Sequence, residues 1–465
     1  MIRYYNSLTK RVDEFHPLVA GRVGLYTCGP TVHDFAHIGN FRAYTWEDLL
    51  RRHLEWRGYE VLHVMNITDV EDKIIRKANE AGVDIREYTA RYTEAFFEDV
   101  RTLHLEPAHH YPRATEHIAE MIELIRRLEE RGHTYVSGGS VYFRIASFPA
   151  YGKLAGLDRE KLIVGARVDA DEYTKDDPAD FVLWKAHKEG EPSWDSPWGP
   201  GRPGWHIECS AMSMKYLGET FDIHTGGVDN KFPHHENEIA QSEGATGKQF
   251  VRYWLHCAHL VVDGEKMSKS LGNFYTLRDL LERGHDPRYI RYVLLGTHYR
   301  RPLNFSFEAL EQARAELSRI DDLVERLERE ATESAGEARW QQRVDAAREA
   351  FGEALDDDLN ISGAMGEIFK LVREVNAGLD RGEVAREDAD AVLGFLREAD
   401  RVVGALFPFE ERREEAPPEV LALLEARTRA RKERNWAEAD RLRDEILARG
   451  WVVEDTPRGA RLKRR

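Results

Sequence analysis

The apolar positions of the first hundred residues alternate between short continuous runs and helically spaced ones. Val23 to Thr27 and Glu60 to Met65 are short apolar runs, which predict buried strands. Between them, Arg42 to Trp56 has apolar residues at helical spacing. A strand, a helix and a second strand within about forty residues predict a βαβ unit, which is parallel and right-handed.

The pattern changes after about Asn304 to long, charged helices with an apolar residue about every 3.6 positions. These helices are expected at Phe307 to Glu330, Trp340 to Ala354, Ser362 to Leu379 and Arg386 to Leu406. Such a series predicts a helical bundle. Further on, two short helices, Glu419 to Lys432 and Trp436 to Arg449, lead into the apolar run Trp451 to Val453, which predicts a small α/β module.

The fold class that follows is α/β. A Rossmann-like parallel-sheet domain carries an insertion and is followed by an α-helical bundle and a small C-terminal α/β module. The insertion is expected to hold a helix, Ala114 to Arg131, and a hairpin at Ser137 to Ser140. The predicted boundaries are 1–105 and 205–260 for the sheet domain, 106–204 for the insertion, 261–305 for a joining region, 306–409 for the bundle, 410–418 for a linker and 419–465 for the C-terminal module.

One Gly-rich segment imitates a dinucleotide-binding motif. Gly199 to Gly204 satisfies the pattern G-x-G-x-x-G. The segment contains two prolines, we expect no strand before it, and a helix is not expected to start there, so we exclude a dinucleotide site. The chain also lacks the G-x-x-x-x-G-K-[ST] pattern of P-loop kinases.

Composition narrows the class of protein. The chain has 465 residues, and 42% of them are hydrophobic, which is typical of a globular protein with several domains. We find no run of about 18 apolar residues, so no membrane association is expected. Three cysteines are too few for a disulfide framework, which favours a reducing compartment and a cytoplasmic location. Nothing in the sequence marks an oligomer interface, so we expect a monomer.

Charge is distributed unevenly along the chain. The net charge is −16, but Arg427 to Arg465 holds 13 Lys and Arg against 7 Asp and Glu, a net of +6. A basic segment on an otherwise acidic protein predicts a contact surface for nucleic acid. The competing interpretation is a solvated tail whose charges keep it soluble.

Two distant motifs have the chemistry of a nucleotide site. His37-Ile38-Gly39-Asn40 places an imidazole beside a small residue, where the first strand passes into its helix. Lys266-Met267-Ser268-Lys269-Ser270 offers two ammonium groups that could follow a triphosphate as pyrophosphate leaves. Each alone is weak, but in this order the pair resembles the nucleotide-binding motifs of class I aminoacyl-tRNA synthetases. We therefore expect His37, Lys266 and Lys269 to be catalytic, and His37, Gly39, Asn40 and Lys269 to bind nucleotide.

Soft and borderline metal ligands occur at three separate places: Cys28, Cys209 and the segment Phe232 to Glu238. If Pro233 opens a helix, His234 and Glu238 stand at i and i+4 on one face. Thiolate, imidazole and carboxylate together favour zinc. On spacing alone the ligand set stays open, because His206 and Cys209 also pair at i and i+3. His235 is expected to face another side, and Cys257 is expected in the core.

The resemblance becomes specific over four longer segments. They are Cys28 to Thr31 before His37, Gly204 to Met212, Phe232 to Gln241, and Lys266 to Asn273. Together they are similar to the cysteinyl-tRNA synthetase family, and the match runs along essentially the whole chain. The resemblance implies ATP-dependent activation of L-cysteine to cysteinyl-adenylate and transfer to tRNA(Cys), with Mg²⁺ on the ATP phosphates. It also implies that the C-terminal module binds the anticodon.

The family resemblance also implies roles for individual residues. It gives Cys28, Cys209, His234 and Glu238 as ligands of one Zn²⁺, and these four with Trp205 as the substrate-binding residues. Zinc would distinguish the thiolate of cysteine from the hydroxyl of serine, which shape alone separates poorly. Gly226 and Gly227 would allow adenosine close to the backbone, and Asp229 would bond to a ribose hydroxyl. A tight turn into the next helix is an equal alternative for these three.

The chain departs from the family pattern at Asn40 and at the end of the segment Gly226 to Asn230, and two other functions stay open. Asn40 stands where the family motif often has histidine, so a cation cannot form there. A first alternative is a cysteine ligase that uses an amino-sugar acceptor, a family without the full C-terminal region. A second is a zinc-dependent RNA-binding protein without catalysis. The complete Lys266 to Ser270 loop and the basic residues 420–465 favour the tRNA ligase.

Overall fold

The computed structural model describes residues 1–157, 179–332, 340–409, 418–432, 435–449, 451–456 and 459–464. The chain divides into two compact units, Met1–Phe407 and Pro408–Arg465. In the described residues, no helix combines the length and the apolar character that a membrane crossing requires.

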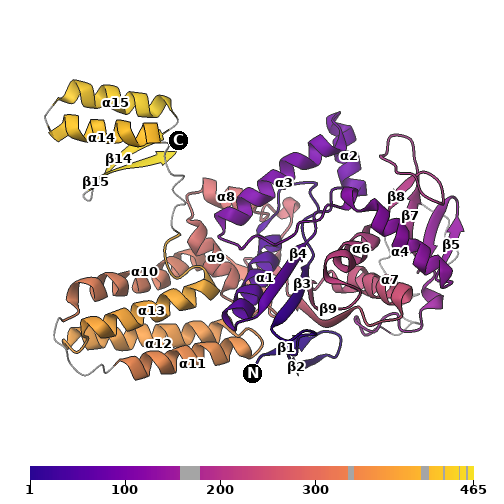
Figure 1. The fold of residues 1–465 in the computed structure, drawn as a ribbon, viewed down its shortest axis with the longest axis horizontal. Helices are drawn as coiled ribbons and strands as arrows, with labels where there is room; N and C mark the ends of the chain where they lie inside the picture. Colours follow the sequence, from indigo (N-terminus) through magenta and orange to yellow (C-terminus); the bar gives the residue numbers. More distant parts are fainter. Residues whose placement is uncertain are drawn as a thin grey trace. The chain divides into compact units, whose positions relative to one another are not determined.

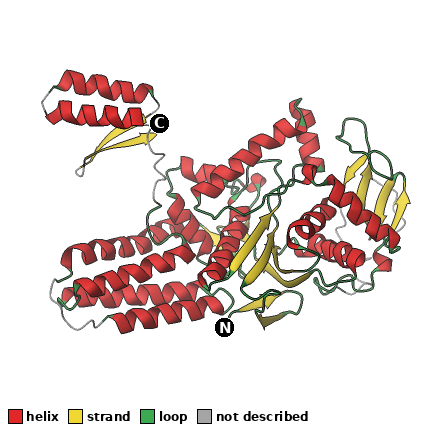
Figure 2. Cartoon of the chain, viewed as in Figure 1, coloured by secondary structure: helices red, strands yellow, loops and turns green. Residues whose placement is uncertain are grey.

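A four-stranded, fully parallel sheet forms the centre of the first unit, with strand order β10-β9-β3-β4. Its strands are β3 (Arg22–Thr27), β4 (Glu60–Met65), β9 (Phe221–Gly227) and β10 (Val251–Cys257). All seven residues of β10 but one are buried, as expected where helices cover both faces of a parallel sheet. Figures 1 and 2 show the sheet between two groups of helices. The predicted βαβ unit and the α/β class are confirmed.

Helix α1 (Ile38–Trp56) connects β3 to β4, and α6 (Trp205–Leu217) lies on the opposite side of the sheet (Figure 1). The apolar spacing predicts the body of α1 but places its start at Arg42, four residues late. His37 is the N-cap, and its side chain accepts from the backbone N of Asn40, whose own side chain accepts from the His37 backbone. This capping box allows the helix to begin at Ile38. The other elements before the insertion are β1 (Arg3–Asn6), β2 (Arg11–Glu14), α2 (Asp72–Ala81) and α3 (Ile85–Thr102).

The region between β4 and α6 contains an antiparallel sheet, β5-β6-β7-β8, beside α4. Its elements are the 3₁₀ turn Ala114–Glu116, α4 (Ile118–Glu130), β5 (Thr134–Ser137), β6 (Ser140–Phe143), the 3₁₀ turn Ile145–Ser147, β7 (Phe181–Ala186) and β8 (Gly201–Pro203). The predicted helix from Ala114 therefore starts at Ile118, after a separate turn.

Our reasons for excluding a dinucleotide site at Gly199 to Gly204 are wrong in part. Strand β8 occupies Gly201–Pro203, and α6 begins at Trp205, directly after the N-cap Gly204. Pro203 closes the strand and Gly204 has extended backbone with φ −71° and ψ 157°, so Pro203 needs no helical position, and Pro200 lies before the strand. The strand here is antiparallel, with β7 as its partner, so the segment is not the first turn of a βαβ unit.

The chain returns from α6 through β9, the π-helical turn Lys231–His235 and α7 (Glu236–Thr246) to β10. The joining region follows with β11 (Leu260–Val262), β12 (Glu265–Lys266), the 3₁₀ turn Lys269–Leu271, α8 (Leu277–Glu282), α9 (Pro287–Leu295) and β13 (Leu303–Phe305). The bundle consists of α10 (Phe307–Glu330), α11 (Gln341–Asp356), α12 (Ile361–Asp380) and α13 (Arg386–Val403), close to the predicted ranges.

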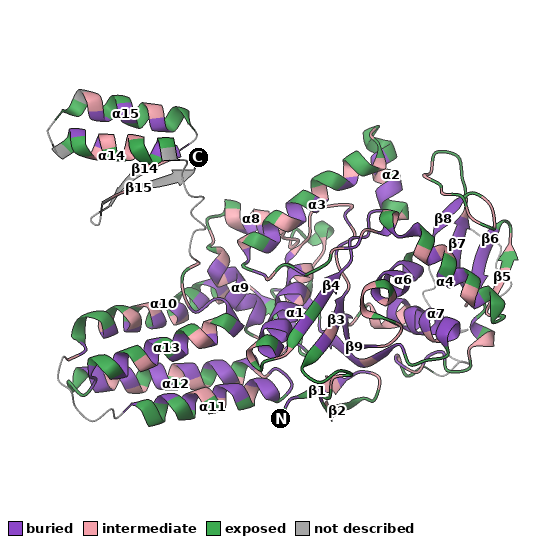
Figure 3. Cartoon of the chain, viewed as in Figure 1, coloured by how far each residue is buried: buried purple, intermediate pink, exposed green. Residues whose placement is uncertain are grey.

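The second unit contains α14 (Pro418–Lys432), α15 (Trp436–Ala448) and the hairpin of β14 (Trp451–Thr456) and β15 (Gly459–Arg464). Trp451 is buried with Val420 and Ile446, whereas Trp436 is 59% exposed. Figure 3 shows this mixture of buried and exposed positions on the two helices. The predicted linker lies outside the described residues up to 417, and Pro418 already belongs to α14.

Candidate active site

Three strands of the parallel sheet end near one another. Cys28 follows β3, Gly226 and Gly227 close β9, and Cys257 closes β10. The backbone N of Cys28 donates to the carbonyl O of Thr225, 3.4 Å away, so the end of β3 is tied to the end of β9. The carboxyl edge of a parallel sheet is the usual place for ligands in open α/β folds.

Cys28, Cys209, His234 and Glu238 meet at this edge. One ligand atom from each lies within 4.8 Å of the ligand atoms of the other three. Cys28 is half-buried and the other three are buried. Their positions come from the loop after β3, from α6, from the π-helical turn and from the first turn of α7. The helix begins at Glu236 and not at Pro233, but His234 Nε2 still lies 3.0 Å from Glu238 Oε1 at the i,i+4 spacing.

The electrostatics favour ionised ligands in this group. Burial alone would raise the pKa of Glu238, but His224 and His234 lower it to about 2. Burial would lower the pKa of His234, yet Glu238 and Cys209 raise it to about 10. A hydrogen bond from Cys28 lowers the pKa of the Cys209 thiol to about 6, against the effect of burial. A thiolate and a carboxylate therefore lie side by side in a buried place, where protonated His234 is the positive partner that a metal ion would replace.

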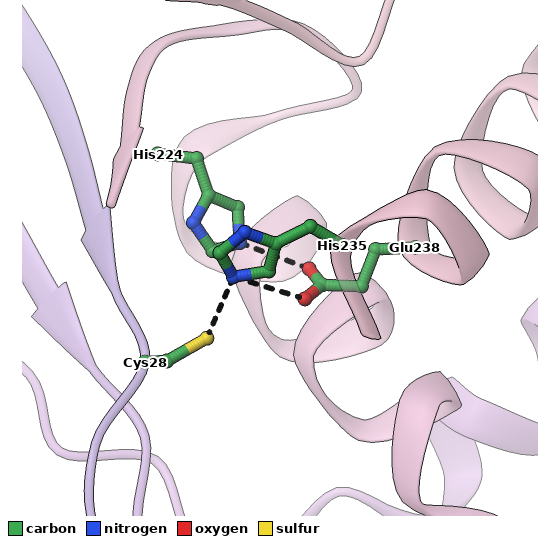
Figure 4. A group of neighbouring side chains, drawn as sticks. All are labelled: Cys28, His224, His235 and Glu238. Carbon is green, nitrogen blue, oxygen red and sulfur yellow. Dashed lines mark hydrogen bonds and ion pairs between the residues drawn. The ribbon is translucent and has the colours of Figure 1, made fainter. Parts of the chain in front are cut away.

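A second group of possible ligands overlaps the first. Cys28, His224, His235 and Glu238 also bring one ligand atom each within 4.8 Å of the others (Figure 4). His224 Nε2 lies 2.9 Å from Glu238 Oε2, and His235 Nε2 lies 3.3 Å from Cys28 Sγ. Our expectation that His235 faces away is wrong, because the π-helical turn rotates this residue toward the end of β3. The two groups share Cys28 and Glu238, so they offer one metal ion two alternative shells.

Two further side chains surround His234. His206 Nδ1 lies 2.9 Å from His234 Nδ1, so a hydrogen bond orients the imidazole and leaves Nε2 toward Glu238. The Trp205 ring stacks on His234 with centroids 4.5 Å apart and is 37% exposed. Trp205 thus forms a wall between the buried group and the surface.

A buried oxygen tests whether a cation fits among these residues. Glu238 Oε1 is buried and accepts no hydrogen bond within the described part of the chain, although His234 Nε2 lies 3.0 Å away. The two atoms are at ion-pair distance without hydrogen-bond alignment. An ion coordinated by Oε1, His234 Nε2 and the two sulfurs would satisfy this oxygen, so the donor set fits Zn²⁺. Cys257 is not in either group, and its thiol is buried in the core as expected.

The two predicted nucleotide motifs pack together. The backbone N of Ile38 donates to the carbonyl O of Tyr275, and His37 forms a β-bridge with Thr276. The Phe274 ring meets the His37 ring edge to face, with centroids 5.2 Å apart. A Cβ at Gly39 would lie 2.9 Å from His37 Nδ1 and 3.3 Å from Met267 Cε, so only glycine fits there. The segment after Lys269 therefore runs directly beside the start of α1.

His37 has a defined proton position. Its Nδ1 accepts from the backbone N of Asn40 at 3.2 Å, so the neutral ring carries its proton on Nε2. Burial lowers the pKa of His37, which favours the neutral form. Asn40 has a structural role as the second half of the capping box, a role that does not need a cationic side chain.

The lysine loop is exposed and tied mainly to itself. Ser268 accepts from the backbone N of Leu271 and caps the 3₁₀ turn, while Asn273 Oδ1 accepts from the backbone N of Ser268 at 2.8 Å. Lys266 lies at the exposed end of β12. The ammonium of Lys269 lies 3.1 Å from Asp34 Oδ2 and 5.1 Å from the centroid of the Phe274 ring. Lys269 thus lies next to the His37 motif, whereas the Lys266 ammonium makes no hydrogen bond or ion pair with another side chain within the described part of the chain.

Gly226, Gly227 and Asp229 lie between the two parts of the site. A Cβ at Gly226 would meet His235 at 2.8 Å, and one at Gly227 would meet the Asp229 carboxylate at 2.3 Å. The backbone N of Asn230 donates to the carbonyl O of Gly227, which closes a turn. Asp229 is exposed, and its negative charge partly opposes the effect of burial, which lowers the pKa of His37. Both glycines are therefore explained by close packing within the protein, and Asp229 lies in the neighbourhood of His37.

Sequence reasoning missed four residues around the buried group. They are His224, His256, Ser7 and Glu47. His256 Nε2 lies 2.9 Å from His235 Nδ1, and Ser7 Oγ lies 2.8 Å from His256 Nδ1. Glu47 Oε1 accepts from Thr225 Oγ1 at 2.7 Å. For the two histidines, the available signal was an imidazole within strands β9 and β10, whose residues are almost all buried, because buried imidazoles need partners.

Comparison with known families agrees with this geometry. The family described as tRNA synthetases class I (C) catalytic domain matches residues 14–315. The DALR domain matches residues 350–407, and the Cysteinyl-tRNA ligase anticodon binding domain matches residues 413–461. The first match alone covers more than half of the chain.

Curated relatives and solved structures are similar along the chain. A cysteine–tRNA ligase of Brachyspira hyodysenteriae is 50% identical, with 100% of this chain and 99% of the relative covered. One of Solibacter usitatus is 51% identical over 100% of both chains. The structure of Mycobacterium tuberculosis methionyl-tRNA synthetase with methionyl-adenylate is 16% identical, has a TM-score of 0.64, and covers 83% of this chain and 92% of its own. That likeness shows the class I fold, and the full-length relatives show that the chain belongs to the cysteine–tRNA ligase family.

Proposed function

We propose that this chain activates L-cysteine with ATP to cysteinyl-adenylate and transfers the cysteinyl group to tRNA(Cys). The observation that carries the proposal is a group of thiol and imidazole side chains at the carboxyl edge of the sheet, whose Cys28 starts the loop that leads to the paired His37 and Lys269 motifs. The carboxylate of cysteine attacks the α-phosphate of ATP, and pyrophosphate leaves. No protein nucleophile is needed, so catalysis rests on positioning and on charge stabilisation.

We propose that Cys28, Cys209, His234 and Glu238 hold one Zn²⁺ and that Trp205 covers the bound amino acid. When bound, zinc supplies a Lewis acid that prefers the thiolate of cysteine to the hydroxyl of serine. Two sulfurs, the low pKa of Cys209 and the unsatisfied Oε1 of Glu238 favour this set over the one with His224 and His235. The latter two instead support Glu238 and Cys28 through their hydrogen bonds.

At the nucleotide end, His37 and the lysines act on phosphate. The Nε2–H of neutral His37 is available as a donor, because Nδ1 is occupied by the cap of α1. Lys269, and Lys266 from the same loop, would bind the departing pyrophosphate together with Mg²⁺. Gly39 and Asn40 would lie against the bound nucleotide. Its adenosine would lie beside Gly226, Gly227 and Asp229.

At the RNA end, the second unit would bind the anticodon of tRNA(Cys). Arg427 to Arg465 carries a net charge of +6, and the ring of Trp436 is exposed on α15. The amino-sugar ligase and the RNA-binding protein without catalysis are less consistent with this chain. The anticodon-binding match disfavours the former, and the intact lysine loop and thiol group disfavour the latter. A cytoplasmic location and a monomeric state remain predictions.

Two assays test the proposal. ATP–pyrophosphate exchange that depends on L-cysteine reports the first step, and attachment of labelled cysteine to tRNA(Cys) reports the second. We expect both activities, with serine supporting neither. Exchange without tRNA charging would favour the amino-sugar ligase, and the absence of both would favour the binding protein.

A further inference from the structure

Asp34 lies between the two nucleotide motifs and belongs to neither. It is in the loop that leads from Cys28 to the N-cap of α1, three residues before His37. Its Oδ1 accepts from the backbone N of Phe35 at 2.9 Å, so the carboxylate is fixed against its own loop. Its Oδ2 accepts from two lysines, Lys269 at 3.1 Å and Lys77 at 3.0 Å. One oxygen therefore receives an ammonium group from the lysine loop and another from α2.

The two lysines differ in how firmly they are placed. The side chain of Lys77 is 29% exposed, and its ammonium also donates to the carbonyl O of His33 at 3.1 Å. The side chain of Lys269 is 68% exposed, and its other described neighbour is the Phe274 ring. Lys77 is thus held in place by two acceptors, whereas the exposed Lys269 side chain can move from Asp34 to another anion. If Lys269 leaves, the Asp34 carboxylate still accepts from Lys77 and from the backbone N of Phe35, so its negative charge keeps a positive partner.

We propose that Asp34 is a positioning residue that holds the ammonium of Lys269 while no nucleotide is bound and gives it up to the ATP phosphates. The inference rests on the proposed role of Lys269 in binding phosphate. The Asp34 carboxylate pairs with the Lys269 ammonium before the ATP phosphates do. Because Lys77 still neutralises Asp34 after Lys269 has left, the release of Lys269 requires little free energy. A contact that exists in the free enzyme and is broken in the complex weakens binding by its own strength.

The expected size follows from the exposure of the pair. Exposed ion pairs change an equilibrium by about two- to five-fold. Asp34→Asn keeps the shape of the side chain and the acceptor for Phe35 but removes the charge that attracts Lys269. The KM for ATP in cysteine-dependent exchange should then fall by about two- to five-fold, while kcat stays within about two-fold.

Limited trypsin digestion tests the contact itself. Trypsin must take up the Lys269 side chain to cleave the Lys269–Ser270 bond, so cleavage requires release from Asp34. In the nucleotide-free protein, Asp34→Asn should speed cleavage of this bond by about two- to five-fold, as followed by mass spectrometry. Saturating Mg²⁺–ATP should bring the two rates together, because Lys269 then lies on phosphate in both proteins. Glu265→Gln, which removes the same charge from the exposed residue just before the lysine loop, is the matched control and should leave both the cleavage rate and the KM for ATP unchanged.

Equal cleavage of Asp34→Asn and wild-type protein without nucleotide would overturn the proposal. A rise in the KM for ATP would also overturn it, because it would mean that Asp34 assists nucleotide binding. An equal change in Glu265→Gln would assign the effect to overall charge. These outcomes are distinct from failure of the proposed role of Lys269, since the digestion detects the Asp34 contact whether or not Lys269 takes part in catalysis.

Discussion

The two halves of the candidate active site are built in opposite ways. The group that would select the amino acid is enclosed: Cys209 and His234 are 2% exposed and Glu238 is fully buried. The loop that would handle pyrophosphate is at the surface, with Leu271 59% exposed and the Lys269 side chain 68% exposed. Selection between sulfur and oxygen needs a fixed, desolvated geometry, whereas following a leaving group needs a segment of low local stability. We therefore expect substitutions in the buried group and in the exposed loop to have different effects.

The largest effect is expected from the buried half. Cys209→Ser replaces a thiolate ligand with a weakly binding hydroxyl, so zinc should be lost and cysteine-dependent exchange should fall on the order of 100-fold or more. Zinc analysis and exchange kinetics measure the two effects. Cys257→Ser changes a buried thiol outside both ligand groups and should keep its zinc. Zinc loss in both variants would mean a general loss of structure, and retention in Cys209→Ser would favour the shell with His224 and His235.

A substitution in the exposed lysine loop should slow catalysis without loss of zinc. Lys269→Ala should lower kcat of exchange on the order of 10²- to 10³-fold, because a donor to developing charge is lost. The KM for ATP should change only a few-fold, and zinc content should not change. Lys370→Ala on the surface of α12 is the control, since Lys370 pairs there with Glu367. An unchanged kcat in Lys269→Ala would remove the loop from the catalytic account.

The second unit repeats the contrast with two tryptophans. Trp451 is buried against Val420 and Ile446, so Trp451→Ala should destabilise this unit by about 3–5 kcal/mol. Trp436 is exposed, so Trp436→Ala should alter stability little but raise the KM for tRNA by about 5- to 50-fold if the ring stacks on a base. Thermal unfolding and charging kinetics separate the two outcomes.

Removal of 408–465 should leave cysteine-dependent exchange intact, and equal losses in exchange and charging would show that this unit supports the catalytic fold.

A buried carboxylate under the site gives a prediction on stability. Burial raises the pKa of Glu47 to about 8, above its value in the unfolded chain. Ionisation in the unfolded state therefore lowers the stability of the protein as pH rises from about 4.5 to about 8. Glu47→Gln keeps an acceptor for Thr225 Oγ1 and removes this cost, so it should stabilise by about 2–4 kcal/mol at pH 9 and by much less at pH 5. Urea unfolding at both pH values checks this, and a constant difference would refute it.

The sequence predicts the regular parts of this fold better than its junctions. Strands β3 and β4 and helix α10 are close to the predicted ranges, since apolar runs and periodicity depend on burial alone. The start of α1 was missed because a histidine cap is an unusual signal. The start of α6 was missed because Gly204 follows a proline that belongs to a strand.

The candidate site shows the same limit. Cys28, Cys209, His234 and Glu238 attract attention as metal ligands, yet spacing alone left their set open and only the family resemblance selected it. The positions of His224, His235 and His256 depend on a π-helical turn and on how β9 and β10 align. Such tertiary geometry has no periodic signature in the sequence. Asp34 likewise gains its meaning only from Lys269, a residue 235 positions away.

The central claim is that the buried group holds a metal that meets the substrate thiol. Replacement of zinc by Co²⁺ makes this visible, because thiolate coordination gives a charge-transfer band in the near-ultraviolet. We expect one Co²⁺ per chain and a stronger band when L-cysteine is added, with no change for L-serine. A band that L-cysteine leaves unaltered, or that L-serine alters equally, would contradict it.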